Sequence, residues 1–373
     1  MTMEVHQKTQ YILLCAVLVV LCLEASLCFA FTSFVFGDSL VDAGNNDYIF
    51  TLSKADSPPY GIDFKASGGR PTGRFTNGRT ISDIIGQELG AKSFPPPYLA
   101  PDTEASSILR GINYASGASG ILDKTGFLFI GRVPLREQVN NFEQSRSYMV
   151  NVMGEISTRE FLKKAIFSLT IGSNDVLNYV QPSIPFFAQD KVSPNMFQDF
   201  MVSNLTQQLK RLHELGARKF IVVGVGPLGC IPFIRAINLL PNGHCFGEVN
   251  DLIQGYNKKL NGVLDQLNQE LGPEAIFVYA NSYDIFMKII VNYHQYGFMD
   301  ADAPCCGGYF PPFVCFMSRN SSSSLCGDRS KYVFWDAYHP TEAANVIIAK
   351  RLLDGDESIC SPINIRELYN YNS

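Results

Sequence analysis

Short apolar runs alternate along this chain with longer runs in which apolar residues recur at helical spacing. The short runs are rich in branched and aromatic residues, and most of them lead directly into Gly, Ser or Asn, which is typical of buried strands that end in a turn. We predict five parallel strands over residues 32–36, 111–115, 165–171, 219–225 and 275–279.

The longer runs predict helices that turn one apolar stripe toward a core. Two of them cover residues 197–215 and 249–271, and a third, over 341–353, is bounded by Pro340 and Gly355 as start and stop signals. Strands that alternate with helices in this way indicate an α/β fold with crossover helices.

The patterned segments belong to one predicted domain, residues 31–373. Patterned segments continue on both sides of the Pro- and Ser-rich stretches 181–194 and 304–324. We therefore expect these two stretches to be surface insertions rather than joints between domains.

The first thirty residues have the features of a secretory signal peptide. An unbroken apolar run over residues 11–23 follows a short polar segment and leads into small residues, so we assign residues 1–30 to the signal. This run is too short to cross a bilayer, which takes about 20 residues in helix. We expect a secreted protein without a transmembrane span, with candidate glycosylation sites at Asn204 and Asn320.

Composition narrows the class of protein further. The 373 residues are 46% hydrophobic and 17% charged with a mean hydropathy of +0.04, which indicates a folded globular chain. Thirty Lys and Arg face 35 Asp and Glu, so the formal net charge is −5. A chain of this balance has no basic surface for a phosphate backbone, and we expect no nucleic-acid partner. The sequence carries no signal for an oligomeric state.

The ten cysteines are consistent with an oxidising compartment. Cleavage after Ala30 leaves seven of them, which cannot all pair, whereas cleavage after Ala25 retains Cys28 and leaves eight. No Cys-x-x-Cys pair occurs over residues 305–326, so disulfides are favoured over a zinc site and no metal is predicted. The seven are Cys230, Cys245, Cys305, Cys306, Cys315, Cys326 and Cys360.

A first polar cluster, residues 37–40 (GDSL), follows the first predicted strand. It places Ser39 in a turn where a following helix would direct its N–H groups toward a nearby anion. Ser39 is a candidate nucleophile, and the alternative is that it only caps that helix. A nucleophile also requires a base.

Two further clusters supply the missing groups. Asn174, directly after the third strand, is a candidate amide donor at the same edge of the sheet, although Asn also suits a tight turn. The three-residue spacing of Asp336 and His339 lets a carboxylate reach one imidazole nitrogen and leaves the other for a hydroxyl. The alternative is a capping Asp beside a surface His. The order Ser, Asp, His is used by hydrolases on parallel sheets, but no Gly-x-Ser-x-Gly elbow occurs in the chain.

With these residues in place, the chain resembles the plant-type GDSL esterase/lipases of the SGNH hydrolase superfamily. The resemblance covers nearly all of the chain after residue 30 and rests on six sequence blocks. They are residues 36–46 (FGDSLVDAGNN), 73–79 (GRFTNGR), 113–120 (NYASGASG), 171–175 (IGSND), 226–230 (GPLGC) and 335–341 (WDAYHPT).

The resemblance implies a role for each candidate. Ser39 would be the nucleophile, with Asp336 and His339 as the other triad members and Asn174 as an oxyanion donor. A glycine of the block 113–120, either Gly117 or Gly120, would supply a further N–H, as would Ser39 itself. The implied fold is a flavodoxin-like three-layer α/β/α sandwich with a central, mostly parallel five-stranded sheet, and no cofactor is implied.

One competing motif, residues 224–229 (GVGPLG), matches a dinucleotide-binding fingerprint after a strand. That fingerprint must open a helix, whereas Pro227 and Pro232 flank this loop. We interpret it as a tight loop held by Cys230, for which Cys245 is a candidate partner.

The function that these patterns favour is hydrolysis of carboxylic esters through an acyl-enzyme on Ser39, with a lipid or another small acyl ester as substrate. Two alternatives stay open. An acyltransferase would use the same acyl-enzyme with an alcohol as acceptor, and a secreted binding protein would keep the fold without the chemistry. The sequence leaves the acyl group and its chain length undetermined.

Overall fold

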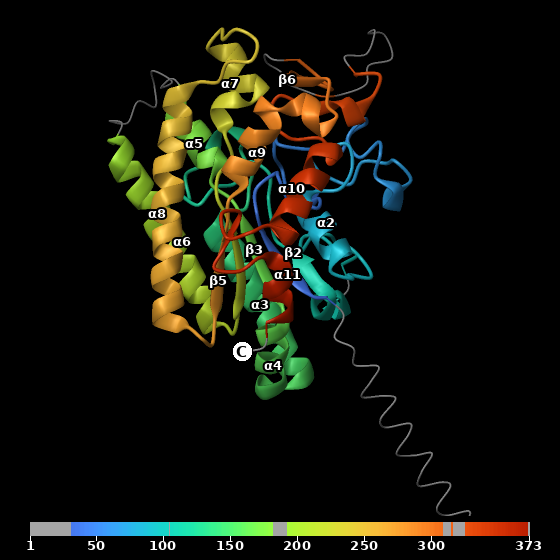
Figure 1. Cartoon of the computed structure of the whole chain (residues 1–373). Helices are drawn as coiled ribbons and strands as arrows, with labels where there is room; N and C mark the ends of the chain where they lie inside the picture. The colour runs from blue at the N-terminus through green and yellow to red at the C-terminus, as the bar shows by residue number, and fades with distance from the viewer. Residues whose placement is uncertain (1–30, 104, 182–191, 309–314, 316–324, 372–373) are drawn as a thin grey trace, which may run out of the picture.

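The computed structural model describes residues 31–371 apart from 104, 182–191, 309–314 and 316–324. The predicted signal peptide, most of both predicted insertions and the sequon at Asn320 lie outside these residues. Within them the chain forms three layers, with a sheet between two groups of helices (Figure 1).

The sheet has six strands in the order β2-β1-β3-β4-β5-β8, and the first five are parallel. The order 2-1-3-4-5 is that of flavodoxin-like folds, so the predicted fold class is confirmed. The strands are β1 (Ser33–Gly37), β2 (Gly111–Asn113), β3 (Ile166–Thr170), β4 (Lys219–Val223), β5 (Ile276–Ala280) and β8 (Cys360–Ser361).

The five predicted strands agree with the structure to within two residues at each end. The sequence analysis missed β8, which pairs antiparallel with β5 and is only two residues long. Such a strand leaves no alternation pattern to detect. A separate parallel pair, β6 (Asp300–Pro304) and β7 (Tyr332–Phe334), lies beside the sheet near the carboxyl ends of its strands.

Long helices cover one face of the sheet, and they include two predicted from the sequence. The helices on this face are α3 (Leu135–Met153), α6 (Pro194–Glu214) and α8 (Gly247–Leu271). The helix α6 begins where the Ser193 side chain accepts a hydrogen bond from the Met196 N–H, with Pro194 at its first position. Both features favour a helix start at this point.

The opposite face is covered by shorter helices, α2 (Ile81–Glu88), α9 (Ser282–Val291), α10 (Glu342–Asp354) and α11 (Ile365–Asn370). The predicted last helix is α10, which begins where the Thr341 side chain accepts from the Ala344 N–H. Three more helices lie at the ends of the sheet, namely α4 (Glu155–Lys164), α5 (Ser173–Val180) and α7 (Pro232–Ile237).

The two faces of the sheet carry different side chains. On the face of α3, α6 and α8, a row of four phenylalanines crosses four strands in register, and all four are fully buried. They are Phe34, Phe167, Phe220 and Phe277. One residue further along each strand, the face of α2 and α10 carries Val35, Ser168, Ile221 and Val278.

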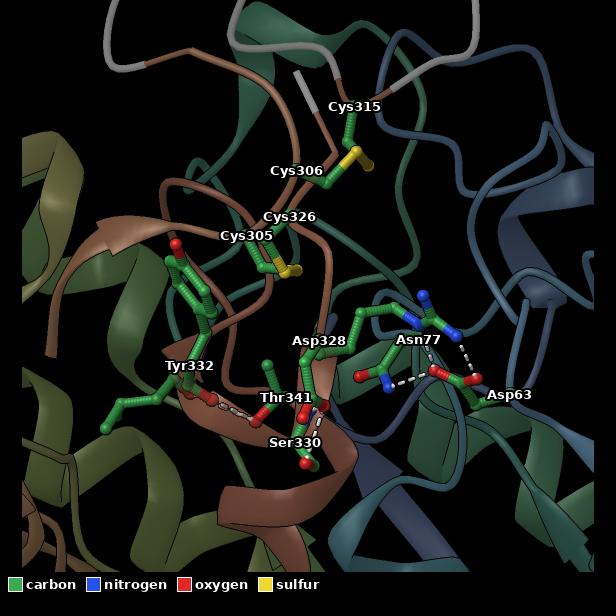
Figure 2. The surroundings of a disulfide bond; sticks show 12 residues. Asp63, Asn77, Cys305, Cys306, Cys315, Cys326, Asp328, Ser330, Tyr332 and Thr341 are labelled. Carbon is green, nitrogen blue, oxygen red and sulfur yellow. Dashed lines mark hydrogen bonds and ion pairs between the residues drawn. A yellow bond between two sulfur atoms is a disulfide. The ribbon is translucent and has the colours of Figure 1, made fainter. Parts of the chain in front are cut away.

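Three disulfides connect loops at the carboxyl ends of the strands. Cys230–Cys245 closes the loop after β4, as the sequence suggested. Cys305–Cys326 and Cys306–Cys315 lie next to the segment that carries Tyr332 and Thr341 (Figure 2). Among the cysteines of the described residues, Cys360 alone is free, and it is buried.

Candidate functional site

Ser39, Asp336 and His339 come together at the carboxyl end of the sheet. The chain continues from β1 toward one edge of the sheet and from β3 toward the other. Ser39 follows β1, and the other two lie between β7 and α10. The Nε2 atom of His339 is 2.7 Å from the Ser39 Oγ. Its Nδ1 atom is 2.9 Å from each carboxylate oxygen of Asp336. A hydroxyl, an imidazole and a carboxylate thus form one hydrogen-bonded chain.

The Asp336 carboxylate is held in one orientation by three donors besides the imidazole, which contacts both of its oxygens. The backbone N–H groups of Tyr338 and His339 donate to its Oδ1, at 2.9 and 2.8 Å. The Tyr60 hydroxyl donates to its Oδ2 at 2.9 Å. Burial acts to raise the pKa of Asp336, but the neighbouring His339 and these hydrogen bonds hold that pKa below its usual value.

Tyr60 is a site residue that the sequence analysis missed. It comes from the loop before the block 73–79, and no motif marks it. Burial, together with the adjacent Asp336 carboxylate, raises the pKa of Tyr60 well above its usual value, so the hydroxyl remains a donor. Its ring also packs edge-on against Trp335, which directly precedes Asp336.

Ser39 lies in a short turn, and no α-helix begins at that turn; the next element is a 3-10 helix of four residues, Asn45–Tyr48. The carbonyl of Asp38 accepts from the Val41 and Asp42 N–H groups, and its Oδ1 accepts from the Leu40 N–H. The expected helix after the first strand is therefore wrong. The chain turns because the Asp42 carboxylate binds the N–H groups of Gly44 and Gly117, which ties this turn to the loop after β2.

Asn174 and the loop over residues 113–120 border the same space. The Asn174 side-chain amide donates one hydrogen to the Ser119 carbonyl at 2.9 Å, which leaves its second hydrogen for another acceptor. The N–H of Gly117 is occupied by Asp42 at 3.0 Å. Between the two candidate glycines, Ala118 adopts a left-handed backbone with φ of 64° and lines the cavity beside Ser39, whereas neither Gly117 nor Gly120 does.

The Asp175 side chain fixes this loop. Its carboxylate accepts from the N–H groups of Ile121 and Leu122 and from the Thr125 hydroxyl, at 2.6 to 3.0 Å. The loop after β3 therefore orients both Asn174 and the loop after β2. The sequence block 171–175 had indicated the position of this aspartate without its role.

The block 73–79 contacts the segment 339–342, which carries His339. The Phe75 ring lies 5.3 Å from the imidazole ring of His339, measured between centroids. The Thr76 hydroxyl donates to the Pro340 carbonyl, and Asn77 accepts from the Glu342 N–H at the start of α10. Residues 75–77 of this block thus hold the segment that carries His339 in position.

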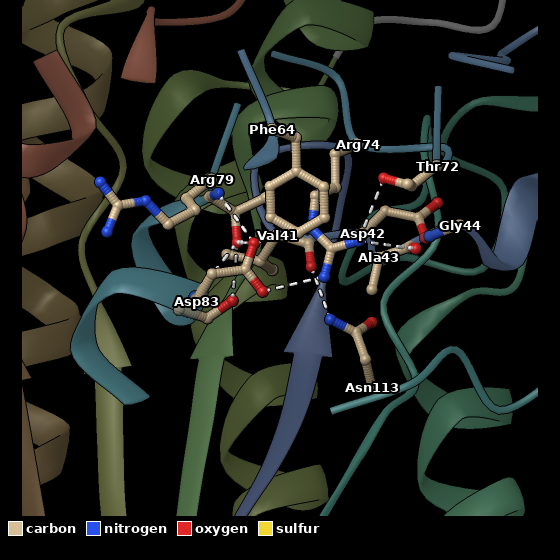
Figure 3. A network of polar contacts seen from close by, with 12 residues as sticks. Val41, Asp42, Ala43, Gly44, Phe64, Thr72, Arg74, Arg79, Asp83 and Asn113 are labelled. Carbon is tan, nitrogen blue, oxygen red and sulfur yellow. Dashed lines mark hydrogen bonds and ion pairs between the residues drawn. The ribbon is translucent and has the colours of Figure 1, made fainter. Parts of the chain in front are cut away.

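Arg74, in the same block, is held in the interior of the molecule by an ion pair with Asp83 (Figure 3). Its guanidinium forms two hydrogen bonds with the carboxylate of Asp83, at 2.7 and 3.0 Å, and donates to the Ala43 carbonyl. Both charged side chains are almost fully buried. The ring of Phe64 covers the guanidinium at 4.6 Å from its centroid.

The comparisons with known proteins agree with this geometry. Residues 34–352 match the family described as GDSL-like Lipase/Acylhydrolase. A GDSL esterase/lipase of Arabidopsis thaliana is 67% identical to this chain over 344 residues, covering 91% of this chain and 93% of that protein. Two further GDSL esterase/lipases of the same plant are 49% and 50% identical, over 90% and 91% of this chain and 87% and 90% of their own.

This chain belongs to the GDSL lipase/acylhydrolase family. The resemblance seen in the six sequence blocks is confirmed. The GDSL motif itself, residues 37–40, contributes Ser39 to the hydrogen-bonded chain with His339 and Asp336. Its buried Asp38 accepts hydrogen bonds from the turn that holds Ser39. Burial raises the pKa of Asp38 to about 7.

In this GDSL family member, a cavity of about 270 Å³ opens beside Ser39 and His339. Its lining is mostly apolar and includes aromatic and branched side chains, among them Leu52, Ile81, Phe129, Phe286 and Ile348. This size is close to the lower end of small-molecule sites in proteins.

Two structural observations complete the description of the site. Among the described residues, no group of three or more His, Cys, Asp or Glu side chains is placed to hold a metal ion. Within the same part of the chain, no helix is long and apolar enough to cross a membrane. The loop 224–229 leads into a short turn of 3-10 helix, Leu228–Cys230, and its residues line the cavity.

Proposed function

We propose that this chain is a secreted serine ester hydrolase that cleaves carboxylic esters through an acyl-enzyme on Ser39. The observation that carries the proposal is the hydrogen-bonded chain Ser39, His339, Asp336 at the mouth of an apolar cavity. Family membership supports activity on esters. The apolar lining favours an acyl ester of a lipid type over a charged or sugar substrate.

The first half of the reaction transfers the acyl group to the enzyme. The Ser39 Oγ attacks the ester carbonyl carbon, and the His339 Nε2 accepts the hydroxyl proton. Asp336 keeps the imidazole in the tautomer with a proton on Nδ1 and stabilises the imidazolium. The tetrahedral intermediate collapses when the C–O bond to the alcohol breaks, and His339 gives the alcohol its proton.

The second half repeats these steps with water. The His339 Nε2 takes a proton from the water, the resulting hydroxyl attacks the acyl carbon, and the free acid leaves as Ser39 regains its proton. In both halves the negative oxygen needs donors that are already in place. We assign this role to the Ser39 N–H, the free Asn174 amide hydrogen and the loop of residues 117–120.

Within that loop we assign the donor to the N–H of Ala118. The glycines Gly117 and Gly120 were the candidates from the sequence, but the Gly117 N–H already donates to Asp42. Ala118 borders the cavity, and its left-handed backbone is unusual for a residue with a side chain.

Secretion forms the second part of the proposal. The apolar run at the start of the sequence, the three disulfides and the exposed sequon at Asn204 on α6 support passage through an oxidising compartment. Expression of the full chain in a plant secretory system, followed by intact-mass analysis, should recover a protein in the medium without its first thirty residues and with a glycan on Asn204.

The catalytic proposal is tested with a fluorophosphonate, a reagent that phosphonylates activated serines with release of fluoride. We expect one adduct per chain, mapped to Ser39, and turnover of a p-nitrophenyl ester by the same preparation. The Ser39→Ala variant should lose both. A folded wild-type protein with neither adduct nor turnover would instead support a binding protein, and preferential transfer of the acyl group to an added alcohol would support an acyltransferase.

A further inference from the structure

The helix α3 carries an amide side chain on its buried face, among residues that are mostly apolar. Gln138 is fully buried, and its neighbours along that face are Leu135, Val139 and Phe142. Burial of an amide costs hydration and rotamer freedom, so a position of this kind ordinarily favours an apolar side chain. The hydrogen bonds of Gln138 show what the amide does there.

The Gln138 amide pairs with both backbone groups of Gly37, the last residue of β1. Its Oε1 accepts from the Gly37 N–H at 2.9 Å, and its Nε2 donates to the Gly37 carbonyl at 2.8 Å. The neighbouring strand β2 ends at Asn113, and no residue of β2 is paired with Gly37. A side chain of α3 therefore supplies, at the end of β1, hydrogen bonds of the kind that a neighbouring strand supplies.

The same amide contacts the loop of residues 117–120. The Nε2 of Gln138 lies 3.2 Å from the Ser119 Oγ, and the Ser119 hydroxyl donates to the Gly37 carbonyl at 3.0 Å. The Nε2 also donates to the Val133 carbonyl, just before α3, at 2.8 Å. One buried side chain thus joins the end of β1, the loop after β2 and the start of α3.

The three donors assigned to the oxyanion belong to segments that meet at this amide. Ser39 follows Gly37 by two residues, and Ala118 directly precedes Ser119. The Ser119 carbonyl accepts the Asn174 amide at 2.9 Å. Among the described residues, those that line the catalytic cavity do not include Gln138, so it can act on the reaction only through these segments.

We propose that Gln138 is a positioning residue, which fixes the turn of Ser39 relative to the loop of Ala118 and Ser119. This inference rests on the proposed function and adds to it a residue outside the cavity. A shift of either segment would move a donor away from the developing negative oxygen, and a displacement of about 1 Å can cost about 10²-fold in rate. Because Gln138 does not line the cavity, its loss should affect kcat rather than KM.

Gln138→Met tests the proposal with p-nitrophenyl butyrate as substrate. Methionine has a similar length, suits a helix and packs in a core, but it cannot form either hydrogen bond with Gly37. We expect kcat to fall about 10- to 100-fold, with KM within about twofold of the wild-type value. Circular dichroism verifies that the variant is folded.

Gln198→Met is the matched control. Gln198 is also a buried residue of a long helix, and its amide donates to the Leu252 carbonyl at 3.0 Å, away from the residues that line the catalytic cavity. This variant loses a buried amide as well, yet its kcat should equal that of the wild type. An equal fall of kcat in both variants would assign the loss to general destabilisation and overturn the proposal.

Ser119→Ala is a milder variant, which carries the test if Gln138→Met does not fold. It removes the hydroxyl between the Gln138 amide and the Gly37 carbonyl and leaves the amide pair with Gly37 in place. Its kcat should fall by less than that of Gln138→Met. In the double variant the two losses should be less than multiplicative, because they act through one network.

Amide hydrogen exchange separates this inference from the proposed function, because it requires no substrate. In folded Gln138→Met protein, or in Ser119→Ala if the former does not fold, the segments 36–40 and 116–120 should both exchange faster than in the wild type, whereas Gln198→Met should change neither. A normal kcat with unchanged exchange would overturn the positioning role and leave the ester hydrolase standing. A wild type that hydrolyses no ester would overturn the proposed function, and the exchange of the two segments would still decide whether Gln138 joins them.

Discussion

The two faces of the central sheet differ in what fills them. On the face of α3, α6 and α8, Phe34, Phe167, Phe220 and Phe277 form a continuous aromatic row, with Phe220 and Phe277 stacked at 4.3 Å between centroids. On the other face, Ser168 and its neighbours leave space. One strand, β3, contributes to both faces with consecutive residues. Consecutive residues of one strand therefore border a densely filled face and a face that leaves a small cavity.

The largest expected effect lies on the aromatic face. Phe167→Ala removes a fully buried ring in contact with Phe34, Phe142 and Phe220, and should lower the free energy of unfolding by about 3–5 kcal/mol. The matched control is Ser168→Ala on the adjacent position, which should change stability by under about 1 kcal/mol. Chemical denaturation monitored by circular dichroism measures both. If both variants lost the same free energy of unfolding, the two faces of the sheet would not differ in their contribution to stability.

The next effect concerns the catalytic end, where the open face meets the loops. Asn174→Ala removes an amide that is positioned for a developing negative oxygen, so kcat should fall by about 10²–10³-fold. The matched control is Asn178→Ala, since Asn178 lines the same cavity from the next turn of α5. A normal kcat in folded Asn174→Ala protein would exclude this amide from the oxyanion site.

A third prediction concerns pH. Burial raises the pKa of Asp38 from 3.8 to about 7, so between these values the folded state holds a proton that the unfolded state has released. This contribution is fully present below about pH 4 and is lost as the pH rises through about 7. From pH 5 to pH 8 it amounts to a loss on the order of 2 kcal/mol. Asp42, whose pKa burial also raises to about 7, acts in the same direction.

Thermal unfolding at several pH values tests this assignment. The wild type should have a higher midpoint at pH 5 than at pH 8, and Asp38→Asn should reduce that difference because an amide does not titrate. Asp328→Asn is the control, since Asp328 is exposed and hydrogen bonds with Ser330 hold its pKa below the usual value. If Asp38→Asn retained the full difference between pH 5 and pH 8, the titration would belong to other groups.

The smallest predicted effect concerns the support of the catalytic carboxylate. Tyr60→Phe removes one of several hydrogen bonds to Asp336 while preserving the packing of the ring. We expect kcat/KM to fall about tenfold, equivalent to about 1.4 kcal/mol, with little change in stability. A kcat/KM equal to that of the wild type in folded Tyr60→Phe protein would assign Tyr60 to packing alone.

The sequence predicted much of this architecture because its signals are local. The strands are apolar runs with clear ends, and the Asp336 to His339 spacing is itself a local geometric constraint. By contrast, Tyr60 contacts Asp336 from 276 positions away in the chain, and no motif in the sequence around Tyr60 predicts that contact. The sequence analysis placed Ser39 in a turn but expected a helix to follow it directly, because the contact of Asp42 with Gly117, a partner 75 positions away, leaves no local signal. Disulfide pairing depends equally on such distant contacts.

The position of Trp335 gives this protein a built-in optical probe. It is the only tryptophan in the chain, it is fully buried, and it immediately precedes Asp336. Its backbone N–H donates to the His339 carbonyl, and Tyr60 touches its ring. Excitation at the red edge of protein absorption therefore reports on the catalytic loop alone. Occupancy of the active site, loop rearrangement and local melting can all be followed by emission, without a label and without altering a single residue.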